Sequence, residues 1–102
     1  MDAVIGPLSK LAPELGRRPV YVTIDIDVVD PAFAPGTGTP EPGGCTPREI
    51  LSAVHLLKDA NVVAFDLVEV CPAYDRSSIT AVLAAKIVRE AILAWGGRPE
   101  KR

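Results

Sequence analysis

The chain has 102 residues, a formal net charge of −2 and a hydrophobic fraction of 48%, which suits one small globular domain and leaves no room for a second. Basic residues are scattered except for Arg98, Lys101 and Arg102, which we interpret as a solvated tail rather than a nucleic-acid interface. No apolar run approaches the roughly 18 residues of a membrane span, and the N-terminus lacks the pattern of a signal peptide. Because Cys45 and Cys71 are too few and too far apart for a disulfide framework, we expect a cytoplasmic protein with free thiols.

A helix, a strand and a loop are predicted in the first half of the chain. Residues 2–15 carry apolar side chains at roughly helical spacing, although Pro7 and Pro13 argue against one continuous helix. Residues 20–28 are rich in β-branched side chains, which predicts a strand. The loop over residues 31–45 is dominated by Pro and Gly. It lacks both phosphate-loop patterns, so we interpret it as a rigid wall rather than a nucleotide site.

The start of the next helix is marked by several signals that agree. Thr46 suits the N-cap, Pro47 the first helical position, and Glu49 completes a capping box. An apolar stripe then predicts a helix to about Asp59. After it, the run "VVAFDLVEV" over residues 62–70 predicts a second strand.

A last helix is predicted to open at Ser77 or Ser78 and to end near Trp95, with Gly96 and Gly97 as a left-handed C-cap. The order of helix, strand, helix, strand and helix predicts an α/β fold with a parallel sheet. The apolar content of both strands suits a sheet covered on both faces. Because two strands are too few for a stable sheet, the chain reads as one part of a larger α/β domain.

Two aspartates lie near the carboxyl end of the first predicted strand. Strand residues two apart point the same way, so Asp25 and Asp27 are expected on one face, about 6–7 Å apart. Two such carboxylates repel each other and lose solvation, and a hard divalent cation removes both problems. Open α/β sheets also place their ligands at the carboxyl ends of strands. The sequence therefore indicates a metal site, with solvated or turn-capping aspartates as the open alternative.

Other polar residues around the strand ends have less specific roles. Asp30 precedes a proline, a turn-initiating pair, and is expected to hold backbone amides of the loop. Glu69, at the carboxyl end of the second strand, could hold a cationic substrate or act as a general base, with a solvated strand end as the alternative. Asp66 is expected to make a structural hydrogen bond and His55 to be a packing or surface residue. Neither cysteine has a neighbouring histidine base in the sequence, which argues against a thiol nucleophile.

Two segments together resemble a known family. The segment "TIDIDVVDPAFAPGTGTPEPGG" resembles the metal-binding signature of the ureohydrolase family, which includes arginase and agmatinase, and "DLVEVCPAYD" resembles its later substrate-site segment. The positions that match the signature are Thr23, Asp25, Asp27, Pro31, Pro35, Gly36 and Gly44. The order and separation of the two segments also match, so the resemblance covers nearly the whole chain. Both look more like agmatinase than like arginase.

The resemblance implies an arginase-like fold, in which this chain is part of a three-layer α/β/α domain. It also implies hydrolysis of a guanidino compound, such as agmatine, to urea and an amine. The reaction uses a pair of manganese ions bridged by a hydroxide that attacks the guanidinium carbon. By the match, Asp25 and Asp27 are metal ligands and Glu69 is the acid that holds the guanidinium group.

The sequence departs from the family in its upstream ligands. Family members bring an early His and a D-A-H-x-D motif to the metals, and neither is present here. Residues 1–102 therefore resemble the C-terminal portion of a ureohydrolase domain, and we expect the isolated chain to be inactive. The resemblance also implies either a homo-oligomer or a missing N-terminal portion as partner.

Two competing interpretations remain open. In a phosphotransferase of the haloacid dehalogenase type, a D-x-D pair supplies nucleophile and acid with magnesium. That class needs a later Lys and an acidic pair after another strand, which the sequence does not offer. The second alternative is a non-catalytic interaction fragment, supported by the absent upstream ligands.

Overall fold

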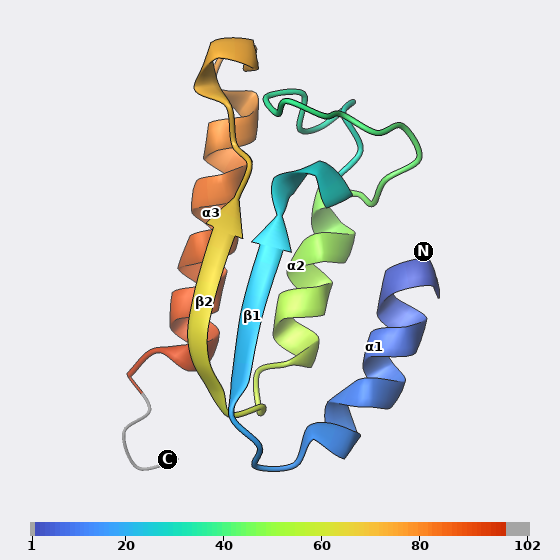
Figure 1. Ribbon diagram of the computed structural model, residues 1–102, viewed down its shortest axis with the longest axis vertical. Helices are drawn as coiled ribbons and strands as arrows, with labels where there is room; N and C mark the ends of the chain where they lie inside the picture. The colour runs from blue at the N-terminus through green and yellow to red at the C-terminus, as the bar shows by residue number, and fades with distance from the viewer. Residues whose placement is uncertain (1, 98–102) are drawn as a thin grey trace.

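The computed structural model describes residues 2–97 and forms an α/β unit with two strands (Figure 1). Its elements are α1 (Asp2–Leu15), β1 (Val20–Asp25), a short 3₁₀ turn η1 (Ile26–Val28), α2 (Pro47–Leu56), β2 (Val62–Val68), a second 3₁₀ turn η2 (Pro72–Tyr74) and α3 (Ile79–Trp95). The C-terminal basic cluster lies outside the described residues. Over residues 2–97, no helix has both the length and the apolarity to cross a membrane.

The two strands pair in parallel, as the element order predicts. The register runs from Val20 opposite Val62 to Asp25 opposite Val68. Both strands run in the same direction, so their carboxyl ends, with the residues that follow them, lie at one edge of the sheet (Figure 1). This edge is where the candidate site is expected.

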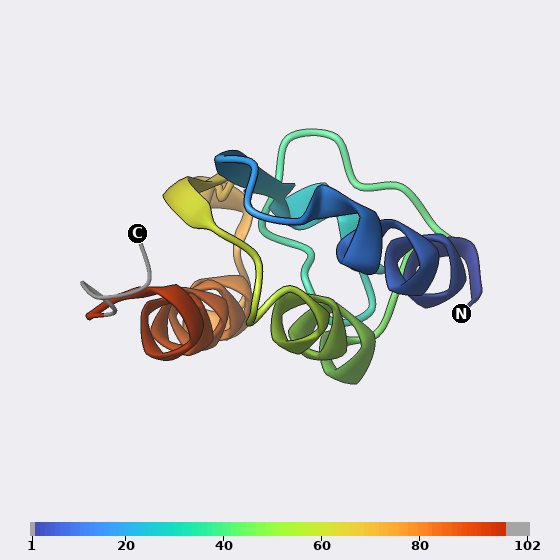
Figure 2. The same cartoon turned by 90° about the horizontal axis from the view of Figure 1, so that it is seen from below.

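Helices cover only one face of this sheet. Seen from below in Figure 2, α2 and α3 lie on the same side of the strands, and α1 lies beside α2. Along β1 the buried Ile24 alternates with the exposed Tyr21 and Thr23, which is the period-2 pattern of a half-covered strand. The second covered face, expected for the larger domain of which the chain is a part, is not formed by residues 2–97. Within residues 2–97 the fold has two layers, and the face that carries Tyr21 and Thr23 has no helix on it.

The core lies between the covered face and the helices. Its largest fully buried side chains are Ile26, Ile87, Val29, Val54, Thr37 and Thr80. Two of these six are threonines that come from the loop and from the start of α3. Their environments differ, because the Thr80 hydroxyl accepts the Gly36 amide, whereas the Thr37 hydroxyl has no hydrogen-bond partner within the described residues.

Helix α1 is continuous in spite of its two prolines. It runs from Asp2 to Leu15 with Pro7 and Pro13 inside it, so the expected interruption is wrong. A proline inside a helix removes one backbone hydrogen bond. Packing opposes this loss, because Val4, Ile5 and Leu8 lie against the buried core cluster. Tertiary contacts therefore outweigh the local preference.

The start of α2 is formed as the sequence predicts. The Glu49 amide donates to Thr46 Oγ1 at 3.2 Å, and the Thr46 amide donates to Glu49 Oε1 at 2.8 Å. The helix ends at Leu56, however, about one turn before Asp59. Trp95 Nε1 donates to the Leu57 carbonyl at 2.8 Å, so a side chain from α3 satisfies a carbonyl at the end of α2.

Helix α3 begins directly after Ser78, as expected, but a more distant side chain caps it. Ser77 and Ser78 have φ values of 54° and 59°, and neither side chain caps the helix. Instead the Asp75 carboxylate accepts the amides of Thr80 at 2.9 Å and Ala81 at 3.0 Å, which are free amides of the first turn. At the other end the expected left-handed cap is wrong for the first glycine, because Gly96 is extended (φ −77°). Only Gly97 is left-handed (φ 64°).

Candidate functional site at the carboxyl edge of the sheet

Asp25 and Asp27 are adjacent at the end of β1, but not on one strand face. The strand stops at Asp25, and Asp27 lies in the 3₁₀ turn η1, so the expected strand to residue 28 is wrong. The Asp27 amide donates to Asp25 Oδ1 at 3.0 Å, which makes Asp25 the N-cap of that turn. The chain bends here because a side chain offers the backbone a local alternative to the strand ladder.

Each of these two carboxylates keeps one oxygen without a hydrogen bond. Asp25 uses Oδ1 for the Asp27 amide, and Asp27 uses Oδ2 for the Thr39 hydroxyl, which donates at 2.9 Å. Within the described residues no hydrogen bond reaches the remaining oxygen of either side chain. Two carboxylate oxygens with available lone pairs fit a hard divalent cation.

The ligand set is nevertheless incomplete in this part of the chain. Over residues 2–97 there is no group of three or more His, Cys, Asp or Glu side chains placed to hold a metal ion. Manganese and magnesium ions take oxygen ligands from carboxylates and water. Asp25 and Asp27 offer two such oxygens, which fits a contribution to a metal site.

Glu69 lies just past β2 in an unusual backbone conformation. Its φ is 74°, a left-handed value that costs a residue other than glycine free energy. The side chain is exposed. The chain on its far side is held, since Val70 forms a bridge with Thr37 and the Cys71 amide donates to the Gly36 carbonyl at 2.7 Å. Glu69 thus lies at the same sheet edge as Asp25, and the residues that follow it contact the loop over residues 31–45, called the site loop below.

Asp30 closes the loop, as the sequence predicts. Its carboxylate accepts the amides of Ala32 at 2.9 Å, Gly43 at 2.9 Å and Gly44 at 3.2 Å. The Ala32 and Gly43 hydrogen bonds, with a smaller effect of Gly44, hold the pKa of Asp30 below its ordinary value. A Cβ atom on Gly44 would lie 2.6 Å from the Val28 carbonyl oxygen, so the loop closes tightly only with glycine there.

Asp66 makes the structural hydrogen bonds that were expected of it. Tyr21 and Thr23 both donate their hydroxyls to its carboxylate across the two strands. The Thr23 and then the Tyr21 hydrogen bond lower the pKa of Asp66, and the bond to Asp66 raises the pKa of Tyr21. This network lies on the uncovered face, and its Thr23 precedes Asp25 by two residues along β1.

The remaining titratable groups named from the sequence lie apart from this edge. His55 Nε2 is 2.9 Å from Glu90 Oε1, so it joins α2 to α3 as a surface residue, and this bond is the main cause that lowers the pKa of Glu90. Cys45 is buried, and burial followed by the nearby Glu49 charge raises the pKa of its thiol. A raised pKa disfavours the thiolate, which makes the Cys45 thiol a weaker nucleophile.

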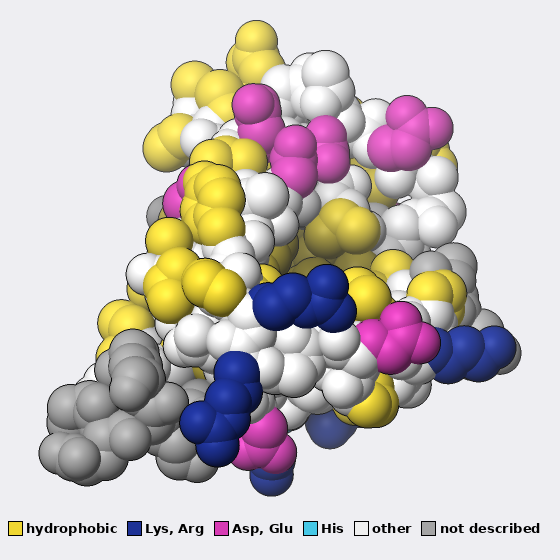
Figure 3. Space-filling view, turned by 60° about the horizontal axis from the view of Figure 1, so that its bottom comes forward, with side chains coloured by type: hydrophobic (Ala, Val, Ile, Leu, Met, Phe, Trp, Pro, Cys, Tyr) yellow, Lys and Arg dark blue, Asp and Glu magenta, His cyan; other side chains and the backbone are white. Residues whose placement is uncertain are grey.

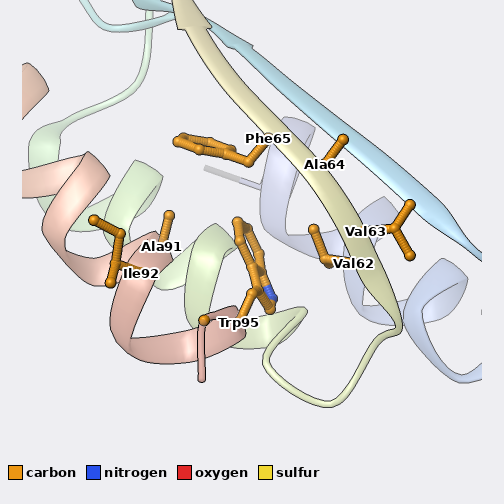
Figure 4. Close-up of a pocket in the computed structure, with 8 residues that line it drawn as sticks. Val62, Val63, Ala64, Phe65, Ala91, Ile92 and Trp95 are labelled. Carbon is orange, nitrogen blue, oxygen red and sulfur yellow. The ribbon is translucent and has the colours of Figure 1, made fainter. Parts of the chain in front are cut away.

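The surface supports the same location for the site. In Figure 3 several acidic side chains gather toward the end of the molecule to which the strands run, and the basic side chains in view lie toward the other end, with further acidic side chains among them. A groove of about 270 Å³ lies elsewhere, between β2 and α3, with apolar walls that include Val62, Phe65, Ile92 and Trp95 (Figure 4). No charged side chain lines that groove, so it offers no group for chemistry on a polar substrate.

Sequence reasoning missed the groups that join the loop to the rest of the site. Thr39 orients Asp27, and Asp75 with Thr80 organises the start of α3. Thr39 contacts a residue 12 positions away, and the Thr80 hydroxyl accepts the Gly36 amide across 44 positions, whereas single-sequence patterns report mostly local structure. The quoted segments "PGTGTPEPGG" and "CPAYD" did contain Thr39 and Asp75, but no spacing rule assigned them a partner.

Comparison with known proteins identifies the family. The Arginase family model matches residues 2–94. The agmatinase of Halalkalibacterium halodurans is 55% identical over 94 residues, which is 90% of this chain and 32% of that protein. Among solved structures, proclavaminate amidino hydrolase from Streptomyces clavuligerus has a TM-score of 0.85 at 48% identity, over 91% of this chain and 31% of that one. A hypothetical agmatinase from Burkholderia thailandensis has a TM-score of 0.87 at 42% identity, over 97% and 32%. The chain spans about a third of the length of these relatives, and it belongs to the arginase family.

Proposed function

We propose that this chain supplies part of the active site of a manganese-dependent enzyme that hydrolyses a guanidino compound, such as agmatine, to urea and an amine. The observation that carries the proposal is the meeting of Asp25, Asp27 and Glu69 at one sheet edge. Relatives named agmatinase at 55% identity support the substrate class. The family match leaves no support for the haloacid dehalogenase alternative.

Each residue has a distinct role in this proposal. Asp25 and Asp27 would hold manganese through the oxygens that no other described group uses, and Thr39 keeps the Asp27 carboxylate oriented. When bound, the metal lowers the pKa of a coordinated water and so makes hydroxide available near neutral pH. Glu69 pairs with the cationic guanidinium group and holds its carbon close to the two aspartates.

The missing ligands belong to a further portion of the protein. We propose that residues 1–102 correspond to the C-terminal portion of a ureohydrolase domain, because the relatives are about three times as long. The uncovered sheet face is the natural surface for that portion, since an exposed two-stranded sheet is only marginally stable. A cytoplasmic location and a homo-oligomeric assembly of the complete enzyme are parts of the same proposal.

Metal binding is tested first, on the chain alone. Manganese titrated into the ¹⁵N-labelled chain should broaden the amide signals around Asp25 and Asp27, because the ion is paramagnetic. Asp25→Asn should abolish the effect, whereas Asp59→Asn, an exposed aspartate in the turn before β2, should leave it unchanged. Equal broadening in the Asp25→Asn chain would rule out these ligands.

Activity is tested by complementation. The part of an agmatinase that this chain does not cover is supplied as a separate polypeptide, and urea release from agmatine is measured with manganese. We expect release from the mixture, none from either polypeptide alone, and none with Asp27→Asn. Manganese-dependent urea release by the 102-residue chain alone would contradict the incomplete ligand set.

The second candidate function is that of a non-catalytic interaction fragment. It is favoured by the uncovered sheet face and by the incomplete metal site in residues 2–97. In addition, the sheet of the described residues has two strands, and the unpaired outer edge of each strand invites pairing with another chain. Stable oligomers that form without metal, together with failed complementation, would favour this function over the enzymatic one.

A further inference from the structure

The site loop is fastened to the start of α3 through a buried threonine. The Gly36 amide donates to Thr80 Oγ1 at 2.8 Å, although the two residues are 44 apart in sequence. Thr80 is completely buried, so water cannot replace this acceptor without opening the core. The same residue donates its backbone amide to Asp75 Oδ1 at 2.9 Å. Thr80 therefore joins the loop backbone to the group that caps α3.

Gly36 and Asp75 are also in direct contact. A Cβ atom placed on Gly36 would lie 2.8 Å from both Cβ and Cγ of Asp75, closer than real atoms approach. Partial burial raises the pKa of Asp75, but the Thr80 and Ala81 hydrogen bonds outweigh it and lower the pKa overall. The carboxylate is thus charged and held fast between helix and loop at neutral pH.

The fastening continues to the backbone beside Glu69. The Gly36 carbonyl accepts the Cys71 amide at 2.7 Å, and the next loop residue, Thr37, pairs with Val70. These two contacts fix the backbone of the residues immediately after Glu69. A left-handed residue other than glycine persists only where its surroundings enforce it, and among the described residues these two links are the backbone contacts that follow Glu69 directly.

We propose that Thr80 and Asp75 are positioning residues of the candidate site, acting through Gly36 to hold Glu69 in its left-handed conformation. Neither residue contacts substrate or metal in this proposal. They rigidify the site loop, which links the end of β1 to the segment after β2. The carboxylates at the two strand ends are thereby kept at a fixed distance and orientation. A positioning role in catalysis rests on the proposed function. The coupling of Thr80 and Asp75 to the backbone conformation of Glu69 does not depend on it.

The coupling is tested with two substitutions at one position. Thr80→Val removes the hydroxyl and nearly keeps the shape of the side chain, and Thr80→Ser keeps the hydroxyl. Amide hydrogen exchange and the backbone chemical shifts of Glu69 are measured by NMR. In Thr80→Val we expect the Gly36 and Cys71 amides to exchange about tenfold faster, and the Glu69 shifts to move away from left-handed values.

Thr80→Ser should keep both the amide exchange rates and the Glu69 chemical shifts of the unsubstituted chain. A loss of packing alone would not predict this result, because serine also lacks the methyl group. Amides of the β1–β2 ladder serve as the internal reference and should be unchanged in both variants. If the Glu69 shifts and the Cys71 protection survive in Thr80→Val, the proposal is wrong. It is equally wrong if every amide, ladder included, loses protection to the same degree.

A second pair of variants decides the question if Thr80→Val does not fold. Gly36→Ala forces a methyl group against Asp75, whereas a Cβ on Gly38 meets nothing within 4 Å. We expect Gly36→Ala to shift the Glu69 signals and Gly38→Ala to leave them in place, and equal behaviour of the two would overturn the proposal. Absence of manganese broadening in the unsubstituted chain would count against the proposed function only, because these readouts need no metal.

Discussion

The backbone of Glu69 makes a quantitative prediction about stability. A left-handed residue other than glycine costs about 1–2 kcal/mol, and Glu69→Gly removes that cost. The glycine introduced in turn lowers the free energy of unfolding by about 0.5–1 kcal/mol, because it makes the unfolded chain more flexible. The exposed Glu69 side chain has no hydrogen bond within the described residues, so little else changes. We expect Glu69→Gly to raise the free energy of unfolding by about 0.5–1 kcal/mol.

The matched control is Glu41→Gly in the site loop. Glu41 is also exposed, and it is not among the residues with positive φ. The same chemical change there should lower the free energy of unfolding by about 0.5–1 kcal/mol. Urea denaturation followed by circular dichroism measures both variants, with equal m-values as the condition for comparison. If Glu69→Gly is destabilised as much as Glu41→Gly, Glu69 carries no strain and the reasoning fails.

Three further predictions concern single side chains. Because the pKa of Asp30 is depressed in the folded chain, its stabilisation is complete above the unfolded pKa of about 4 and is lost as pH falls through the folded value. Asp30→Asn should therefore reduce the loss of unfolding free energy as pH falls below about 4. The same loss in the variant and the unsubstituted chain would contradict a role of the Asp30 carboxylate in closing the loop. Trp95→Phe should lower the free energy of unfolding by about 1–2 kcal/mol, because the Leu57 carbonyl loses its donor, and thermal denaturation measures the loss. Thr37 is 2% exposed and its hydroxyl has no partner within the described residues, so Thr37→Val should raise stability by about 1 kcal/mol in urea denaturation. A loss of stability would show instead that the Thr37 hydroxyl is satisfied in solution.

Sequence reasoning succeeded where the cause of a feature is local. The capping box at Thr46 and Glu49 involves residues three apart, and both hydrogen bonds form as expected. Asp30 likewise closes the loop that begins beside it. The parallel α/β arrangement followed from the order of elements. The first two features depend on side-chain chemistry within or beside one short segment, and the third depends on the order in which such segments follow one another.

The failures share the opposite property. Pro7 sits within a helix because distant core residues pack against α1. The strand ends before Asp27 because the Asp25 carboxylate accepts the Asp27 amide and so favours a 3₁₀ turn. Hydrophobic periodicity does not decide between that turn and a longer strand. Metal-ligand roles for Asp25 and Asp27 and a substrate role for Glu69 stay predictions. Their arrangement depends on loop contacts that no spacing rule reveals.

The distribution of charge along the molecule has a kinetic consequence. The strands run along the longest dimension, 41 Å. The exposed Asp25 and Glu69 lie at their carboxyl ends, and the exposed Arg17 and Lys58 lie in the segments that precede their amino ends. These four charges contribute to an electric dipole whose negative pole is the acidic edge. A cationic ligand is steered toward that pole before any contact forms. Because the field is screened over about 8 Å at physiological ionic strength, association rates for such ligands should fall as salt is added, while rates for neutral analogues stay constant.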